Sequence, residues 1–273
     1  MTRMNKVADT HKDNVDSAPE YMVYRPFGPN IIHTKMSNEL VDALHGVFLK
    51  QSKKEELDVS EDNQYGLAGN NKVEFFITEE LLGSSTQLLT NCLTGCATEL
   101  YTSNIKANWA HQQKIVTPKH REIIESHFKN IQLNIAIIDV WGNVSVAGDF
   151  NPPHRHTAMI SGVGYIKMPD DIEKEWLLED HDPSSGMINF WDGRPALYGV
   201  HMHRVKPVVG DIYCFPAWLP HSVHPFRSKG ERWSFSFNID IANQNPDLEM
   251  TEFEKAELRA ERRRLLKELK NAE

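Results

Sequence analysis

Two histidines separated by one residue give the clearest chemical signal in the sequence. His154 and His156 follow two prolines in Asn151-Pro-Pro-His154-Arg-His156, and prolines favour extended backbone in the residues before them. Residues i and i+2 of a strand share a face, so we expect both imidazoles to project side by side from the start of a strand. Such a pair can bind one metal ion. The alternative is a chance pair on an exposed strand.

A third histidine stands far along the chain, where a second hairpin is predicted. Gly210-Asp211 indicates a tight turn, a short apolar strand follows, and a proline-rich loop leads to His221 at the start of the next strand. An antiparallel barrel can bring two such strand starts together. Two ligands on one strand and one on a distant strand is the arrangement of mononuclear non-haem iron sites. His224 falls on the opposite face and is expected at the surface or behind the ligands.

A strand after His221 carries a candidate anion-binding residue. Alternation places three polar side chains on one face, Arg232, Ser234 and Ser236, and three aromatic ones on the other, Trp233, Phe235 and Phe237. An arginine inside a barrel needs an anionic partner, because a buried charge is costly unless it is paired. The carboxylate of a ligand is such a partner for a guanidinium group. In the alternative arrangement the aromatic side chains face inward and the polar face is exposed.

The elements that must position these residues suggest a mainly β protein with helical support. Strands are predicted over 133–141, 143–146, 159–168, 186–191, 197–205, 210–215, 222–226 and 232–241. They are short and are separated by turn residues, without long helices between them, which favours an antiparallel sandwich or barrel.

Helical patterns flank this β-rich region on both sides. Helices are predicted after an N-cap at Ser37 and over 78–101, where Gly83 and Gly95 weaken the pattern. We therefore expect a flexible tail at 1–20 and one domain at 21–249, with helical support at 37–130 and a β-core at 131–242. A C-terminal helix is expected at 250–273. It would pack on the core or on a second subunit, so a homodimer is possible.

Composition excludes several classes of function. The 273 residues carry a formal net charge of −8, which argues against nucleic-acid binding as the main activity. Three cysteines do not predict a disulfide framework. No apolar run approaches the length of a membrane span, and the polar N-terminus does not resemble a signal peptide. A cytoplasmic protein is expected, in the host cytoplasm if the gene is viral.

The order of these motifs resembles that of the iron(II)- and 2-oxoglutarate-dependent oxygenases. The resemblance covers roughly residues 139–239. It is closest to a poorly characterised group, frequent in phages and marine bacteria. The shared motifs are Asn-Pro-Pro-His-x-His, then Ser-Gly-x-x-Tyr ending at Tyr165, then Gly-Asp-x-x-x-Phe-Pro and His-Ser-Val beginning at His221.

This resemblance implies a specific fold and chemistry. The fold would be a double-stranded β-helix, a jelly-roll barrel like that of the cupins, with Fe(II) at its mouth. The co-substrate 2-oxoglutarate would be held by Arg232 and Ser234, and Asn143 and Tyr165 are further candidates for contact with it. The reaction would couple oxidative decarboxylation of 2-oxoglutarate by O2 to hydroxylation of a substrate C–H bond. The substrate, a small molecule or a protein side chain, is not indicated.

One departure from the family pattern concerns the second histidine. The superfamily usually has His-x-Asp or His-x-Glu, whereas this chain has His156 in the place of the carboxylate. First, His154, His156 and His221 could form a three-histidine site. Second, His156 could be the first ligand, which leaves Ala158 at the carboxylate position. Third, only His154 and His221 could bind the metal.

Two other classes of protein fit part of the pattern. A cupin-type metal enzyme or small-molecule binder would use the same histidines without 2-oxoglutarate. The glutamate that cupins usually place shortly after His-x-His is missing here, and Arg232 and Ser234 would have no role. A structural protein on a degenerate oxygenase scaffold is the third possibility, and the presence of all three histidines with Arg232 argues against it.

Overall fold

Two antiparallel β-sheets face each other in the computed structural model, which describes residues 20–24, 28–52, 73–112, 126, 133–178, 184–191 and 201–243. The larger sheet has the strand order β1-β2-β9-β6-β11-β4-β3 and the smaller one β5-β10-β7-β8. The strands of the larger sheet are β1 (Met22–Tyr24), β2 (Ile31–Lys35), β3 (Val73–Phe76), β4 (Leu133–Ser145), β6 (Ile160–Lys167), β9 (Asp211–Pro216) and β11 (Arg232–Asn243). Those of the smaller sheet are β5 (Asn151–His154), β7 (Ile188–Trp191), β8 (Met202–Val205) and β10 (His221–Val223).

The chain passes repeatedly between the two sheets from β4 onward. Strands β4, β6, β9 and β11 lie in the larger sheet, and β5, β7, β8 and β10 lie in the smaller one. This alternation of eight antiparallel strands is the double-stranded β-helix, and it confirms the predicted fold class. An apolar cluster that includes Tyr165, Phe190, Tyr213 and Phe215 fills the space between the sheets.

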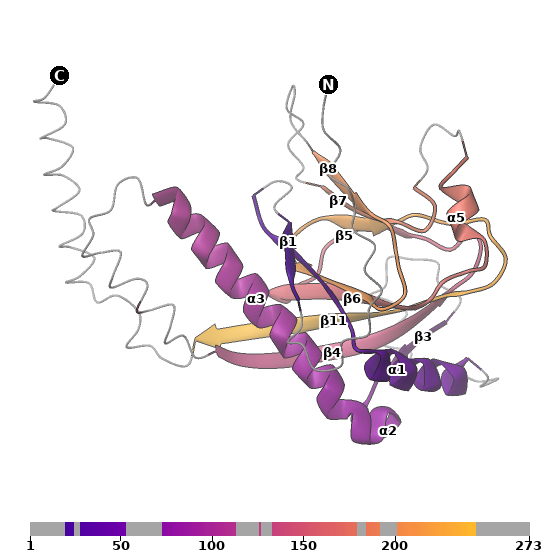
Figure 1. The fold of residues 1–273 in the computed structure, drawn as a ribbon, viewed down its shortest axis with the longest axis horizontal. Coiled ribbons are helices and arrows are strands. Elements are labelled where there is room, and N and C mark those ends of the chain that lie inside the picture. The colour runs from indigo at the N-terminus through magenta and orange to yellow at the C-terminus, as the bar shows by residue number, and fades with distance from the viewer. Residues whose placement is uncertain are drawn as a thin grey trace, which may run out of the picture.

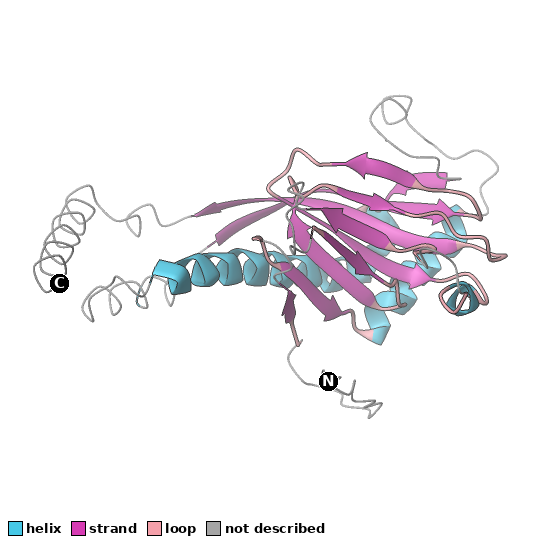
Figure 2. Ribbon diagram, turned by 90° about the horizontal axis from the view of Figure 1, so that it is seen from above, coloured by secondary structure: helices cyan, strands magenta, loops and turns pink. Residues whose placement is uncertain are grey.

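Helices cover the outer face of the larger sheet (Figure 1, Figure 2). They are α1 (Asn38–Gln51), α2 (Glu79–Leu82) and α3 (Thr86–Gln112), and a fourth short helix, α5 (Ile172–Glu175), lies between β6 and β7. Helix α1 begins at the predicted N-cap, where the Ser37 side chain accepts a hydrogen bond from the backbone N–H of Leu40 at 3.2 Å. No helix in the described part of the chain is long and apolar enough to cross a membrane.

The helix-covered face of the larger sheet is built from aromatic rings laid over glycines. Phe235 and Phe237 of β11 lie directly opposite Gly164 and Gly162 of β6. A Cβ atom at either glycine would clash with the ring that covers it. The aromatic residues thus pack toward α1 and α3 in one core cluster, and the other face of β11 is left for polar side chains.

A β-bulge in β4 changes which residues face the interior. Asn238 pairs with Asp139 but the next residue, Ile239, pairs with Ile137, so β4 has one extra residue here. Ile137 and Val140 both pack in the helix-side core cluster. Ile138 and Asp139 between them therefore both lie on the opposite face, the one that continues into the barrel.

Several predicted elements differ in detail from those in the structure. The helix expected over 78–101 is interrupted at Gly83, whose φ of 55° ends α2 before α3 begins. His154 is the last residue of β5, not at the start of a strand as predicted, and His156 lies two residues beyond the end of β5. Residues 1–19 of the tail expected at 1–20, and the helix expected at 250–273, lie outside the described residues.

Replacement of Gly162 by alanine should destabilise the fold. The added methyl group would meet the Phe237 ring and the Tyr213 carbonyl, and overpacking of this kind costs about 1–3 kcal/mol. Gly46 of α1 is a matched control, because nothing lies within 4 Å of a Cβ atom added there. Gly46→Ala should stabilise the helix by up to about 1 kcal/mol. Urea denaturation of both variants measures these changes, and equal stability of Gly162→Ala and wild type would contradict the packing described.

Candidate functional site

Strand pairing brings the first and third predicted histidines together. Strand β10 lies beside β5, and His221 is directly opposite His154 in the register of this pair. His156 is held in place by its backbone N–H, which donates to the carbonyl of Ala217 at 3.0 Å. That carbonyl belongs to the turn that leads into β10. One end of this strand pair therefore positions all three imidazoles.

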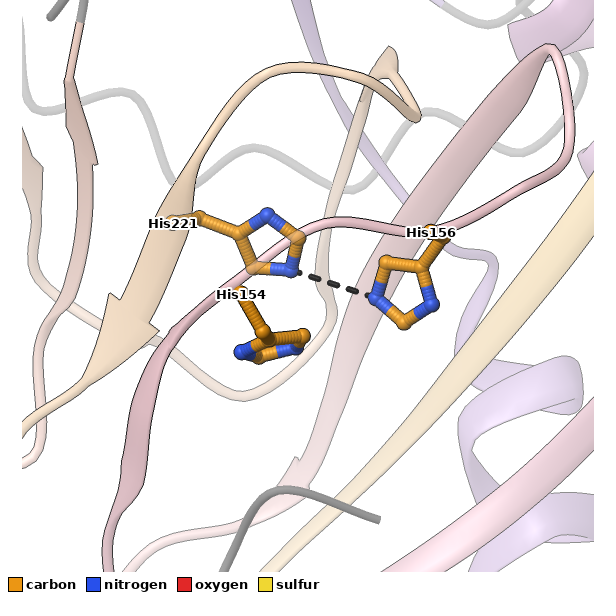
Figure 3. Close-up of side chains that lie close together, drawn as sticks. All are labelled: His154, His156 and His221. Carbon is orange, nitrogen blue, oxygen red and sulfur yellow. Dashed lines mark hydrogen bonds between the residues drawn. The ribbon is translucent and has the colours of Figure 1, made fainter. Parts of the chain in front are cut away.

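The three side chains converge on one point (Figure 3). One ring nitrogen from each of His154, His156 and His221 can be chosen so that all three lie within 4.8 Å of one another. The Nε2 atoms of His156 and His221 are 3.3 Å apart. Adjacent ligands at metal–nitrogen distances of 2.0–2.1 Å would be separated by roughly 3.0 Å. The cluster therefore already has nearly the spacing that a single metal ion requires.

Backbone carbonyls set the tautomer of two of the rings. The Nδ1 atom of His154 lies 2.7 Å from the carbonyl of Pro152, and that of His221 lies 2.9 Å from the carbonyl of Leu219. A carbonyl can only accept, so each Nδ1 must carry the proton and donate it. Each Nε2 is left with a free lone pair for a metal, which is the usual outer hydrogen bonding of metal-bound histidines.

Burial keeps two of the imidazoles neutral, which is the form that binds metals. Desolvation, with a contribution from His154, lowers the pKa of His221 to about 3 and that of His156 to about 4. Phe215 and Phe190 pack against His221, with ring centroids 4.8 Å and 6.1 Å away. At neutral pH these two imidazoles are therefore uncharged, and a metal ion can bind them without first removing a proton from an imidazolium group.

Arg232 lies at the opposite end of the barrel interior from the histidines. Only 3% of the residue is exposed, and its guanidinium group donates to the Gly186 carbonyl at 3.2 Å and to Ser145 Oγ at 3.0 Å. Its Nε has no hydrogen-bond partner. Among the residues that the structure describes, no carboxylate forms an ion pair with it. Desolvation lowers its pKa, while Tyr165 and Asp149 act in the opposite direction.

The other predicted co-substrate residues lie on the same interior face. Ser234 is in register with Tyr165 on one side and with Asn143 on the other. All three are buried, and the Asn143 amide donates to Ser236 Oγ at 3.3 Å. The Tyr165 hydroxyl is enclosed and has no hydrogen-bond partner. Burial raises the pKa of Tyr165, so this hydroxyl keeps its proton.

The two faces of β11 distinguish the predicted alternatives. The polar face with Arg232 and Ser234 is directed between the sheets, and the aromatic face packs on the helices. The alternative in which the polar face is exposed is therefore wrong. Sequence reasoning missed Ser145, which contacts Arg232 from 87 residues away, because the register of two distant strands leaves no local signal.

Other histidines of the sequence are placed outside the cluster. His224 follows β10, and its Nδ1 lies 3.1 Å from Ser184 Oγ. It lines an open depression of about 680 Å³ with Ser184, Phe226 and Arg227, at the other end of the barrel from the three histidines. His203 lies beside Phe190, two strands from His221 in the same row. Trp141 contacts His156, with ring centroids 5.9 Å apart.

The donor set and the interior fit a mononuclear iron site with an anionic co-substrate. Three imidazoles suit a divalent transition metal, and the Nδ1 hydrogen bonds of His154 and His221 leave their Nε2 atoms free to bind it. The unpartnered Arg232 Nε and Tyr165 hydroxyl offer hydrogen-bond donors to a carboxylate deeper in the same interior.

One family match agrees with this chemistry. Residues 139–238 match the family described as "Putative 2OG-Fe(II) oxygenase". A comparison with curated proteins finds no match. Among solved structures, a Pseudomonas putida prolyl-4-hydroxylase is 16% identical over 76% of this chain and 91% of its own, with a TM-score of 0.41. A viral collagen prolyl hydroxylase from Paramecium bursaria Chlorella virus-1 is 14% identical over 77% and 94%, with a TM-score of 0.38.

A prolyl hydroxylase from Trichoplax adhaerens, solved with a peptide of hypoxia-inducible factor, is 10% identical over 81% of this chain and 83% of its own, with a TM-score of 0.43. These identities are too low to indicate the chemistry of the site, which follows from its own residues. The stretch that matches this family holds the three histidines, Tyr165 and Arg232.

Proposed function

We propose that this protein is an Fe(II)- and 2-oxoglutarate-dependent oxygenase, a hydroxylase in which His154, His156 and His221 bind Fe(II) and Arg232 binds the distal carboxylate of 2-oxoglutarate. The main support for the proposal is the burial of Arg232 without an ion pair to a carboxylate. Arg232 is a buried cation without a carboxylate partner, in the same enclosed interior as three convergent metal ligands. Burial of such a charge costs stability, and a counter-ion bound beside it would offset that cost.

The residues around Arg232 have complementary roles in binding. Ser145 and the Gly186 carbonyl hold the guanidinium plane, so its free edge has a defined direction. The Tyr165 hydroxyl can donate to a carboxylate oxygen, and Ser234 and Asn143 line the path toward the metal. The ring centroid of Phe226 lies 5.7 Å from the guanidinium carbon, and this ring helps to exclude water from the Arg232 end of the interior. This arrangement would bind a five-carbon dicarboxylate in one orientation.

Around the metal, the chain would supply neutral ligands and apolar side chains that exclude water. The iron, when bound, supplies oxygen activation coupled to decarboxylation of the co-substrate. Phe190 and Phe215 shield His221 from solvent, and the Leu219 carbonyl fixes its ring. Trp141 flanks His156 on the side of the barrel mouth. The substrate would approach from this side, because the opposite end of the interior is taken by Arg232.

The cupin-type alternative uses the same metal ligands but gives Arg232 no task. The two functions therefore predict different effects when Arg232 is replaced. In a cupin-type enzyme that does not use 2-oxoglutarate, loss of Arg232 would alter folding stability alone. In the proposed enzyme, it removes co-substrate binding.

Replacement of Arg232 by methionine should abolish 2-oxoglutarate binding. The variant keeps an apolar side chain of similar length, and the lost charge-assisted contacts correspond to at least roughly a hundredfold weaker binding. The measurement is anaerobic titration of the Fe(II)-loaded protein, following the visible charge-transfer band, with succinate formation as a second signal. Arg227→Met, at an exposed position five residues earlier, is the matched control and should bind normally. An unchanged titration of Arg232→Met would rule out the proposed role.

Replacement of Tyr165 by phenylalanine should separate binding from stability. The hydroxyl is buried without a partner, so its removal should leave the protein without co-substrate as stable as wild type or slightly more stable. The loss of one hydrogen bond should weaken 2-oxoglutarate binding by about 5- to 30-fold. Thermal denaturation with and without 2-oxoglutarate tests both parts. A variant that is less stable in both conditions would show a purely structural hydroxyl.

Replacement of His156 by alanine should distinguish the three possible ligand sets. If all three histidines bind the metal, His154→Ala, His156→Ala and His221→Ala should weaken Fe(II) binding to a similar degree, within about tenfold of one another. Anaerobic metal titration and protein-bound iron after gel filtration are the measurements. Nearly normal binding by His156→Ala alone would show that only His154 and His221 are ligands. The set with Ala158 at the ligand position requires His154→Ala to be the mild variant.

A further inference from the structure

The barrel mouth beside His156 has a distinct rim that the proposed iron and co-substrate sites do not use. We define the mouth rim as Ile138, Asp139, Trp141, Met159 and Trp218. The ends of β4 and β11 project beyond the other strands here (Figure 1, Figure 2). Three of the five side chains, those of Ile138, Met159 and Trp218, are exposed at 55%, 50% and 55%.

Backbone contacts connect the parts of the rim into one surface. The Ala217 N–H donates to the Met159 carbonyl at 3.1 Å, and the Ala217 carbonyl accepts from His156. The Met159 N–H donates to Asp240 Oδ1 at 2.9 Å, which joins the rim to the end of β11. Trp141 reaches the metal cluster through His156. The rim therefore lies directly outside the three histidines.

Asp139 is the charged residue among the five of this rim, and the exposed Asp240 adjoins the rim at Met159. The bulge at Ile138 places Asp139 on the interior face, two residues from Trp141 and opposite Asn238. The Asp139 Oδ1 is shielded from water and has no hydrogen-bond partner. The side-chain oxygen of Asn238 is likewise shielded from water and without a hydrogen-bond partner. Within the described part of the chain, no lysine, arginine or histidine forms an ion pair with Asp139.

Two acceptor oxygens without donors, Asp139 Oδ1 and Asn238 Oδ1, therefore lie on paired residues of β4 and β11. Desolvation raises the pKa of Asp139 and Asn238 lowers it by hydrogen bonding, so the carboxylate is held in a setting that disfavours an uncompensated charge. A bound cation would compensate it and would supply the missing donors. The tryptophans of the rim add ring faces, which attract cations.

We infer that Asp139 is a specificity-determining residue, and that the substrate carries an ammonium or guanidinium group that binds Asp139 and Asn238 at the mouth rim. This inference rests on the proposed function, because it places the substrate outside the iron. The apolar rim residues would contact the hydrocarbon part of such a substrate. An anionic substrate is excluded by the same carboxylate, and a neutral one would leave the charge uncompensated.

The experiment compares charged probes with uncharged probes of the same shape. The pairs are choline with 3,3-dimethyl-1-butanol, and N-acetylarginine amide with N-acetylcitrulline amide. Saturation-transfer NMR on the protein loaded with 2-oxoglutarate and Zn(II) measures probe binding. A parallel sample with Mn(II) measures the paramagnetic relaxation of the probe protons, which reports proximity to the metal.

For wild type we expect at least one charged probe to bind about fivefold more tightly than its neutral partner and to be relaxed by Mn(II). Asp139→Asn should remove that preference. Asp170→Asn, which removes one exposed carboxylate in the turn after β6 at the other end of the barrel, should retain it. Thermal denaturation confirms that both variants are folded.

The inference is overturned if neither charged probe is preferred by wild type, or if the preference survives in Asp139→Asn. The comparison of probes on wild type needs no variant, so it stands even if Asp139→Asn is unstable. Failure of the proposed function appears separately, as absence of bound Mn(II) or of 2-oxoglutarate binding. Saturation transfer does not depend on the metal. If Mn(II) or 2-oxoglutarate does not bind, it therefore still shows whether Asp139 selects cationic probes.

Discussion

The register of β5 against β10 is the constraint on which the site depends. His221 lies opposite His154 in this pair, and a slip of one residue would turn one imidazole to the other face of the sheet. The same short strands fix the loops that follow them. The Ala217 carbonyl holds the backbone of His156, and the carbonyls of Pro152 and Leu219 hold two of the rings. Backbone geometry alone thus positions three ligands from two distant segments.

Polar and apolar residues divide the larger sheet into two functional faces. One face is sealed by aromatic rings over Gly162 and Gly164 and by the helices. Sealing it with apolar contacts leaves the other face of β11 free to carry Arg232, Ser234 and Ser236 into the barrel. Burial of a guanidinium group costs stability unless it is hydrogen-bonded, and Ser145 and the Gly186 carbonyl offset part of that cost. The helix-side core therefore supports an interior that is poorly stabilised without ligands.

The sequence predicted most of the residues in the site but not how they meet. Alternation along one strand separated Arg232 from the aromatic residues, because the period of two is a local property. The N-cap at Ser37 was equally local and was confirmed. The contact of Ser145 with Arg232 and the bulge at Ile138 depend on pairing between strands far apart in sequence. The position of His156 beyond β5 could not be predicted either, since its tether is a carbonyl 61 residues away, at Ala217.

Charge balance links the unusual histidine to the acidic mouth. A metal centre with His156 in place of a carboxylate has no negative protein ligand, so Fe(II) and Arg232 together would contribute three positive charges. Bound 2-oxoglutarate supplies two negative ones, so these three groups together would carry an excess of one positive charge, and Asp149, which acts on Arg232, lies at the end of the interior away from the iron. Such an excess would repel a cationic substrate, and interactions between buried charges are weakly screened. Asp139 places one carboxylate between this centre and solvent, where it balances the excess and makes the mouth accessible to a cation.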